Sequence, residues 1–257
     1  MIRRPPRSTQ GVSSAASDVY KRQGATEAGA TEFVVNTGSP WNQIPLEELD
    51  ERAELIRGWW KPDQTMEGMD ETFDAAFVLS MHAKARTPGA LATHTWSFTI
   101  FDFRVNGTSI GELGMAVFFA AACGVPTALV SGDTATCKEA IDLLGDVETA
   151  ATKESISWVA AKCRHPSLVL KDIREAAKRA VGRLGDFKPI SLESPVTVEI
   201  DMVSPNMIPW WTAVPTVEAT GPCGIRFQAE DYRAAHRLFV MMDKLHSAFH
   251  TEAGIVL

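Results

Sequence analysis

The chain has 257 residues, of which 45% are hydrophobic and 22% are charged. This composition is ordinary for a globular protein, and it excludes wholesale disorder, collagen-like repeats and a disulfide-framed miniprotein. The formal net charge is −7, which argues against nucleic acid or an anionic membrane surface as the main partner. The longest apolar run, near residues 115–123, is much shorter than a membrane-spanning helix of about 20 residues. We therefore expect neither nucleic acid nor a membrane as a partner.

The cysteines indicate the compartment. Cys123, Cys137, Cys163 and Cys223 show no paired Cys-x-x-Cys spacing. This pattern favours reduced thiols over a disulfide framework or a zinc knuckle. We therefore expect a cytoplasmic protein.

Residues 1–23 differ from the rest of the chain. They are basic, rich in serine and proline, and without a hydrophobic period. An Arg- and Ser-rich segment also fits a transit peptide, but Pro5 and Pro6 interrupt any amphipathic helix there. We expect residues 1–23 to be a non-native or disordered extension without core contacts, standing where a first strand would belong.

From residue 24 the chain alternates between strand and helix patterns. Short apolar runs bounded by polar residues are typical of buried parallel strands, and they occur at residues 31–36, 74–81, 126–131 and 147–152. Helical periodicity with suitable caps predicts helices over residues 45–58, 111–123, 134–144 and 166–184. The order of these elements predicts an α/β protein, with a Rossmann-like three-layer core around a mostly parallel sheet over residues 24–186.

The pattern changes toward the C-terminus. Residues 96–105 are rich in β-formers, and Asn106-Gly107 predicts a hairpin turn into residues 108–110. After residue 187, alternating strands are expected at 196–201 and 224–228, followed by a helix over 230–249. We predict a smaller α+β subdomain over residues 187–257.

Three ionisable side chains follow predicted strands. His82 comes directly after the strand at 74–81, His94 lies in the loop that follows, and Glu112 begins the helix after the hairpin. Ligands of α/β sheets bind at the carboxyl ends of strands, and two histidines with a carboxylate are the materials of a hydrolytic zinc site. The spacing is not a local metal motif, so two loop histidines and a helix-start glutamate remain an alternative.

Other candidates have simpler explanations. His236, His246 and His250 lie in the last predicted helix without the glutamate of an HExxH motif, so we interpret them as an exposed helix face. Asp133 is interpreted as a helix N-cap. The pairs Trp59-Trp60 and Trp210-Trp211 favour core or interface packing.

Several motifs carry a resemblance to a known family. They are AGATEFVVN at residues 28–36, GxDxTFDAA at 68–76, HAxAxTPGxxxxH at 82–94, NGxxxGELG at 106–114, VPTALVSGD at 125–133 and IRFQAEDYRAA at 225–235. In this combination the chain resembles the D-aminopeptidase family of zinc metallopeptidases, typified by the D-aminopeptidase of a dipeptide-transport operon. The likeness runs from Glu27 to Phe249.

The resemblance implies a specific chemistry. Family members hold two zinc ions and release N-terminal D-amino acids from short peptides. The family's motifs make His82 and Glu112 metal ligands and His94 the catalytic group. The resemblance also implies a homo-oligomeric ring, for which a decamer is the candidate size.

The chain departs from the family pattern at two places. The family begins with a strand that carries an Asp-x-Glu metal pair, and nothing in this sequence corresponds to it. The family's ligand histidine after the next strand is also missing, because the loop here reads Asn-Thr-Gly-Ser-Pro-Trp over residues 36–41. The predicted function is therefore a metal-dependent D-aminopeptidase. The alternative is a ligand-poor, weak or inactive relative that binds a small molecule or acts structurally.

Overall fold

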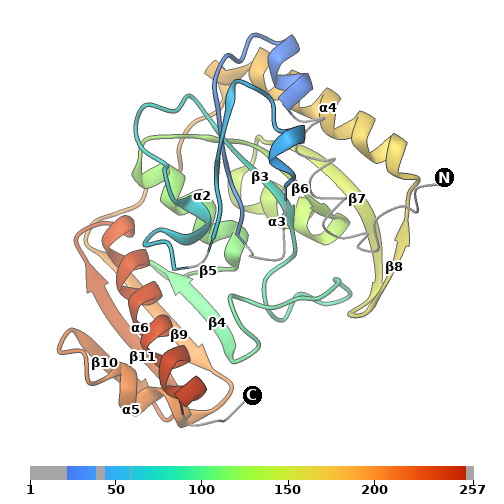
Figure 1. Ribbon diagram of the computed structural model, residues 1–257. Helices are drawn as coiled ribbons and strands as arrows, with labels where there is room; N and C mark the ends of the chain where they lie inside the picture. The colour runs from blue at the N-terminus through green and yellow to red at the C-terminus, as the bar shows by residue number, and fades with distance from the viewer. Residues whose placement is uncertain (1–21, 39–43, 59, 253–257) are drawn as a thin grey trace.

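The computed structural model describes residues 22–38, 44–58 and 60–252. Its centre is a four-stranded sheet in the order β3-β6-β7-β8 (Figure 1). Strands β3 (Ala76–Met81), β6 (Thr127–Asp133) and β7 (Glu148–Ser157) run parallel, while β8 (Ala160–Cys163) pairs antiparallel with β7. Every residue of β6 is buried, as expected for a central strand whose two faces are both covered.

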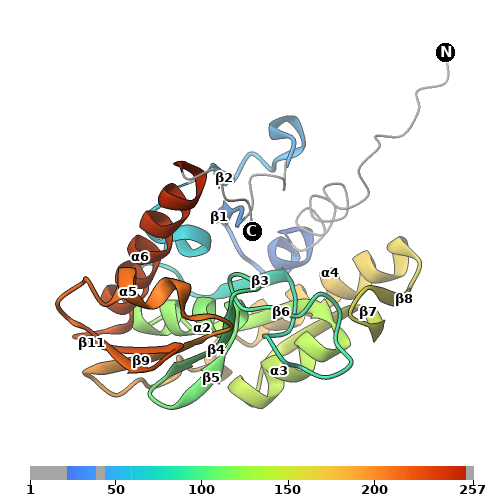
Figure 2. The same ribbon diagram turned by 90° about the horizontal axis from the view of Figure 1, so that it is seen from below.

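Helices cover both faces of this sheet. Helix α4 (Pro166–Gly182) packs on one face, where Leu129 of β6 joins its apolar cluster. Helices α2 (Glu112–Ala122) and α3 (Thr134–Leu144) share the other cluster with Val130. Neighbouring strand residues point to opposite faces, so the apolar run of β6 is divided between the two sides. Figure 2 shows α3 and α4 on opposite sides of the sheet, which confirms the predicted three-layer α/β class.

A second, antiparallel sheet has the order β10-β11-β9-β4-β5. Its strands are β4 (Ile100–Val105), β5 (Thr108–Ile110), β9 (Val196–Met202), β10 (Val217–Gly221) and β11 (Gly224–Ala229), and it packs against α6 (Tyr232–Glu252) and α5 (Ile208–Trp211). Asn106 and Gly107 have φ of 47° and 79°, which confirms the hairpin turn. The sheet joins strands from both sides of residue 187, and a subdomain boundary at that residue stays a prediction.

The N-terminal strands form a separate sheet. Strand β1 (Phe33–Asn36) pairs in parallel with β2 (Ala53–Ile56), so the predicted helix over residues 45–58 is wrong. Only Leu46–Glu48 form a 3₁₀ turn there. In this region Leu49 and Leu55 pack against the buried side chains of Val35 and Ile44. Pairing with β1 therefore overrides the local helical preference.

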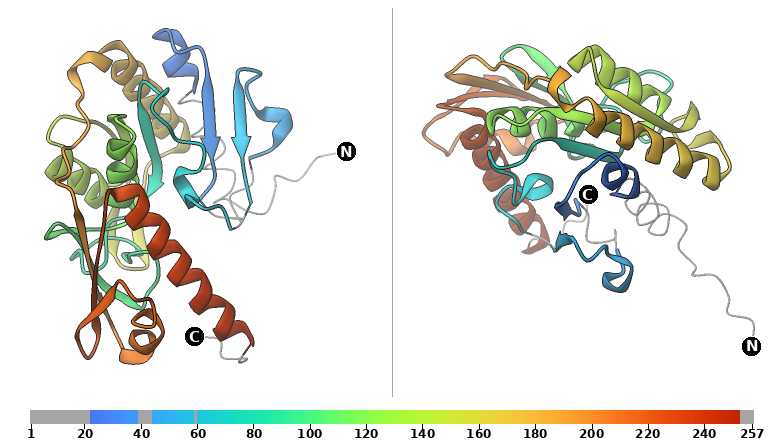
Figure 3. Two further views of the ribbon diagram at one scale, coloured as in Figure 1. Left: turned by 90° about the vertical axis from the view of Figure 1, so that its left-hand side faces the viewer. Right: turned by 90° about the horizontal axis from the view of Figure 1, so that it is seen from above.

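A cleft separates β1 from β3. It has a volume of about 1170 Å³, and residues 33–36 and 75–80 both line it. The strands that line it run in the same direction (Figure 3). Neither strand has a hydrogen-bonded neighbour on the cleft side within the described sheets. The sheet is therefore interrupted between β1 and β3.

Most other sequence predictions hold. The strands at 31–36, 74–81 and 126–131 and the helices at 111–123, 134–144 and 166–184 are present within a few residues. Strand β7 extends beyond the predicted 147–152, and β8 and β10 were not predicted. Further 3₁₀ turns are at Gln64–Met66, Leu184–Asp186 and Pro205–Met207.

The predicted N-terminal extension overlaps the structure at its end. Residues 1–21 lie outside the described part of the chain. Residues 22–27 are helical, and Arg22 is only 2% exposed. The last two residues of the predicted extension are therefore part of a helix, with Arg22 buried, and the extension over residues 1–23 stays a prediction.

The described residues contain neither a membrane-spanning helix nor a disulfide bond. No helix there combines the length and apolar character that a membrane crossing requires. The four cysteines, all within described segments, are free thiols.

Candidate metal and catalytic site

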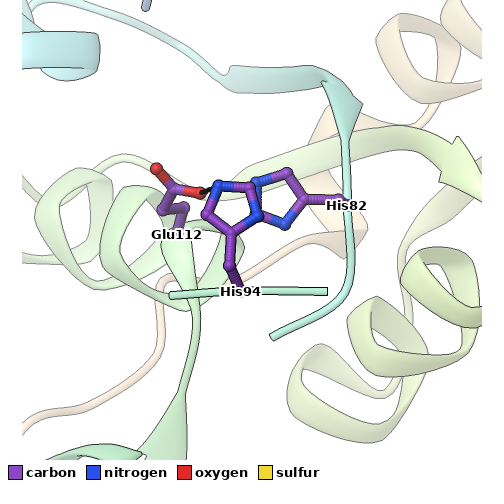
Figure 4. A group of neighbouring side chains, drawn as sticks. All are labelled: His82, His94 and Glu112. Carbon is purple, nitrogen blue, oxygen red and sulfur yellow. Dashed lines mark ion pairs between the residues drawn. The ribbon is translucent and has the colours of Figure 1, made fainter. Parts of the chain in front are cut away.

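The three side chains singled out in the sequence lie together at the carboxyl end of β3. His82 follows β3 directly, His94 lies in the next loop, and Glu112 is the first residue of α2. Glu112 Oε2 is 2.6 Å from His82 Nε2 and 3.7 Å from His94 Nε2. The two imidazole rings stack with centroids 3.9 Å apart (Figure 4). Residues far apart in the sequence therefore present two nitrogens and one oxygen to a common point.

A close backbone approach sets the position of Glu112. The N-cap of α2 is Gly111, and a Cβ at that residue would lie 2.8 Å from Lys84 Cα. Only glycine allows the start of α2 to lie this near the segment after β3. Lys84 Nζ also donates to the carbonyl oxygen and hydroxyl of Ser109, at 2.9 Å each. These contacts hold Glu112 beside His82.

Asp133 anchors the loop that carries His94. This residue ends β6 and caps α3 by accepting hydrogen bonds from Thr136 N and Oγ1, both at 2.7 Å. Its second oxygen accepts from Ser155 Oγ at 2.5 Å and from Leu91 N at 3.2 Å. Burial alone would raise the pKa of Asp133, but these hydrogen bonds outweigh it and lower the pKa. An ionised carboxylate therefore ties the loop to the central strand, beyond the simple N-cap that the sequence indicated.

The same loop is fixed again next to His94. Ala92 N donates to the carbonyl oxygen of Trp158 at 2.9 Å, and Trp158 Nε1 donates to the carbonyl oxygen of Thr93 at 3.3 Å. The tip of the β7–β8 hairpin thus holds the backbone immediately before His94. This contact was not foreseen, because β8 and its hairpin have no clear turn motif in the sequence.

Backbone carbonyls select the tautomer of both histidines. His82 Nδ1 lies 3.1 Å from the carbonyl oxygen of Ala83, and His94 Nδ1 lies 2.7 Å from that of Ala92. A carbonyl oxygen only accepts hydrogen bonds, so each Nδ1 carries the proton. With a metal ion between the rings and Glu112, each neutral ring would present its Nε2 lone pair to the ion, which is the arrangement of metal-binding histidines.

The electrostatics of the site follow from partial burial. Burial lowers the pKa of His82, but the Glu112 carboxylate, whose Oε2 lies 2.6 Å from His82 Nε2, raises it above its ordinary value. Behind this pair, burial raises the pKa of Glu139, whose carboxylate accepts a hydrogen bond from Lys84 N at 2.8 Å. The histidines and Glu112 retain about a quarter of their side-chain exposure, so the site is open to a ligand.

The donor set fits a metal ion. The ligand atoms of His82, His94 and Glu112 all lie within 4.8 Å of one another, in the single group of this kind found in the described part of the chain. Glu112 Oε2 is buried and makes no hydrogen bond of good geometry with any described residue. A buried carboxylate oxygen without a hydrogen bond is costly unless a cation compensates it. Two imidazoles and a carboxylate are the ligands of many catalytic zinc sites.

An aromatic wall continues from the site, and the sequence analysis did not identify it. Phe98 lies 5.0 Å from the ring of His94, and Trp158 meets Phe98 edge to face at 5.7 Å. Both rings are more than half exposed. Aromatic residues beside a histidine in the motif THTWSF could have suggested Phe98, but Trp158 is distant in sequence.

Comparisons with known proteins identify the family of this chain. The family model of the D-aminopeptidases (peptidase M55) matches residues 16–241. The D-aminopeptidase of Bacillus subtilis (strain 168) is 34% identical over 223 residues, covering 86% of this chain and 81% of that protein. The chain belongs to the D-aminopeptidase family.

A solved structure of this family has the same fold. The Zn-dependent D-aminopeptidase DppA from Bacillus subtilis, a self-compartmentalizing protease, superposes with a TM-score of 0.87 at 32% identity. The match covers 91% of this chain and 86% of that chain. The family predicted from the sequence motifs is therefore confirmed, and the D-aminopeptidase activity, a hydrolase reaction, is favoured over the ligand-poor structural alternative. The individual roles of His82, His94 and Glu112 stay predictions.

Proposed function

We propose that this member of the D-aminopeptidase family is a zinc-dependent enzyme that releases N-terminal D-amino acids from short peptides. The observation that carries the proposal is the meeting of His82 Nε2, His94 Nε2 and Glu112 Oε2 at one point. The zinc dependence of the Bacillus subtilis relative supports the choice of metal.

His82 and Glu112 are the metal ligands in this proposal. A zinc ion bound there would polarise the scissile carbonyl and lower the pKa of the attacking water. The described residues offer one such group, which has ligands for one ion. A second zinc per subunit, as the family resemblance implies, needs ligands from elsewhere.

His94 is the catalytic residue in this proposal, and it moves a proton. Water adds its oxygen to the carbonyl carbon, the C–N bond breaks, and the departing amine nitrogen must gain a proton. His94 Nε2 takes the proton from the water and delivers it to that nitrogen. The hydrogen bond from Nδ1 to Ala92 keeps the ring oriented for this transfer.

The interrupted sheet bears on the organisation of the chain. We propose that residues 24–186 form the metallopeptidase core and that a strand is missing between β1 and β3. The cleft between their free edges supports this. A parallel strand in the cleft would end at the same sheet edge as His82, where further ligands are needed. A non-native extension over residues 1–23, whose last two residues join the helix at 22–27, and an α+β subdomain over residues 187–257 complete the proposed division.

We also propose a homo-oligomer, with a ring as its form and a decamer as a candidate size. Trp60 and Trp210 are 66% and 56% exposed, and a lone subunit would leave this apolar surface in water. The relative in Bacillus subtilis is described as self-compartmentalizing, which supports assembly.

The free thiols support a reducing compartment, and we propose the cytoplasm.

Hydrolysis of paired dipeptides tests the proposed function. The purified chain is loaded with zinc and given D-Ala-Gly or L-Ala-Gly, with a chelator-treated sample in parallel. We expect release of D-alanine that requires zinc and exceeds release of L-alanine at least tenfold. The His94→Ala variant should lose about 10²–10⁴-fold in kcat, which is the usual contribution of general acid–base catalysis.

Two results would overturn the proposal. Equal hydrolysis of both dipeptides would contradict the D-specificity. Full activity in His94→Ala would contradict the role of that residue in proton transfer.

A further inference from the structure

The aromatic wall beside His94, formed by Phe98 and Trp158, lies at the surface and is not part of the apolar core. Phe98 is 66% exposed and Trp158 is 51% exposed, and Ile156 and Val159 on the same hairpin are 67% and 79% exposed. Apolar side chains gathered on a surface indicate a contact with something else. This surface adjoins the candidate site, because the rings of His82, His94, Phe98 and Trp158 follow one another in contact.

The wall is held in place before any ligand arrives. The indole of Trp158 donates to the carbonyl oxygen of Thr93, and the carbonyl of Trp158 accepts from Ala92 N. These are the two residues immediately before His94, so the wall and the proposed catalytic residue are fixed to the same stretch of backbone. A rigid apolar surface binds an apolar group with little ordering cost.

The proposed proton transfer by His94 indicates which part of a peptide substrate lies beside the wall. This step rests on the proposed function. His94 delivers its proton to the nitrogen of the departing residue, so that nitrogen lies near His94 Nε2. The ring of Phe98 packs 5.0 Å from the ring of His94. The side chain of the departing residue is attached one carbon away from that nitrogen, within reach of this wall.

We propose that Phe98 and Trp158 form a subsite for the side chain of the second residue of the peptide, the one that departs after cleavage. The subsite selects an apolar side chain such as leucine over glycine. Phe98 is the specificity-determining residue, because it lies between His94 and Trp158. The competing explanation is that a second copy of the chain covers this wall.

Binding of uncleavable analogues tests the subsite without relying on turnover. The probes are reduced-amide dipeptides of D-alanine with leucine or with glycine, titrated by calorimetry into zinc-loaded protein. We expect the wild type to bind the leucine analogue about tenfold more tightly, since partial burial of an isobutyl group has about this value. Phe98→Ala should abolish the preference, because binding of the leucine analogue weakens about tenfold more than binding of the glycine analogue. The matched control, Val159→Ala, removes an exposed apolar group from the same hairpin and should keep the preference.

Three results would overturn the subsite. They are equal binding of both analogues by the wild type, an unchanged preference in Phe98→Ala, and no binding of either analogue. Light scattering, which measures the mass of the assembly, distinguishes the subsite from a contact between subunits. If Phe98→Ala loses assembly but keeps the preference for the leucine analogue, the wall is a subunit contact. Zinc-dependent cleavage of D-Ala-Gly by the wild type, measured alongside, reports on the proposed function independently.

Discussion

Two histidine environments of this protein show how the same side chain takes opposite roles. At the carboxyl end of β3, His82 is partly exposed and its Nε2 faces a carboxylate oxygen. On α6, His236 is 3% exposed, and neither of its ring nitrogens has a hydrogen-bond partner among the described residues. Rings of Trp96, Phe119 and Tyr232 surround it.

The pKa values move in opposite directions for this reason. Burial lowers the pKa of His82, but Glu112 more than compensates and the net shift is upward. Burial lowers the pKa of His236 to about 4, and the charge of Asp63 offsets only a small part. Only the first environment presents nitrogen lone pairs to a ligand. The second is a packing position, where a charge has no partner.

Removing either proposed metal ligand should have the largest effect. His82→Ala and Glu112→Gln should each lower kcat/KM for D-Ala-Gly by at least about 10³-fold, because the one remaining ligand holds zinc poorly. Steady-state kinetics at saturating zinc measure this. His165→Ala, which changes an exposed histidine at the start of α4, is the control and should stay within twofold. A decrease in kcat/KM of less than tenfold in both variants would show that His82 and Glu112 do not bind the metal.

Asp133→Ala should destabilise the protein by about 3 kcal/mol and also lower kcat. The substitution removes an N-cap and the charged hydrogen bonds to Ser155 and Leu91, which together account for this order of energy. Urea unfolding gives the free energy. Asp231→Ala is the matched control, because Asp231 caps α6 by a single bond to Ala234 N at 2.8 Å. It should cost about 1 kcal/mol and leave kcat unchanged. Equal effects of the two variants on kcat would disprove the anchoring of the His94 loop.

His236 should make the protein sensitive to acid. The unfolded chain binds a proton near pH 6.5, whereas the folded state binds it only near pH 4. Between these values the unfolded state holds more protons, so stability falls as the pH falls. The pKa difference corresponds to about 3 kcal/mol.

A variant without the imidazole isolates this contribution. His236→Phe keeps an aromatic ring in the cluster and removes the titration. Its unfolding free energy should fall by about 3 kcal/mol less than that of the wild type between pH 7 and pH 4. Parallel pH profiles of the two proteins would show that His236 is not the acid-sensitive group.

Gly111→Ala should have the smallest effect, about 2 kcal/mol of stability together with weaker zinc binding. The added Cβ would lie 2.6 Å from Lys84 Cβ and force the start of α2 away from His82. Thermal unfolding and zinc titration measure the two effects. Gly185→Ala adds a methyl group where nothing lies within 4 Å, so this control should change stability by less than about 0.5 kcal/mol. A stable Gly111→Ala with normal zinc affinity would refute the close-approach argument.

The sequence grouped the three candidate site residues correctly, but it did not predict all the elements around them. His82, His94 and Glu112 follow predicted strands, and the rule that ligands bind at carboxyl ends of strands was sufficient to group them. The helix predicted at 45–58 failed because pairing of β2 with β1 is a tertiary effect that the local period does not encode.

The remaining errors share this cause. His236 was interpreted as part of an exposed face, yet it is buried. Its environment depends on Trp96 and Phe119, which are far away in the sequence. Trp158 was missed because its contact with Thr93 joins two elements whose proximity only the fold reveals. The side chains of His246 and His250 lie outside the described residues.

Zinc content measured by equilibrium dialysis and elemental analysis tests the central claim most directly. We expect about one tightly bound zinc per chain in the wild type and in His236→Phe, and none retained by His82→Ala or Glu112→Gln after dialysis. Equal zinc retention by all four proteins, or none in the wild type, would contradict a metal site built from His82 and Glu112.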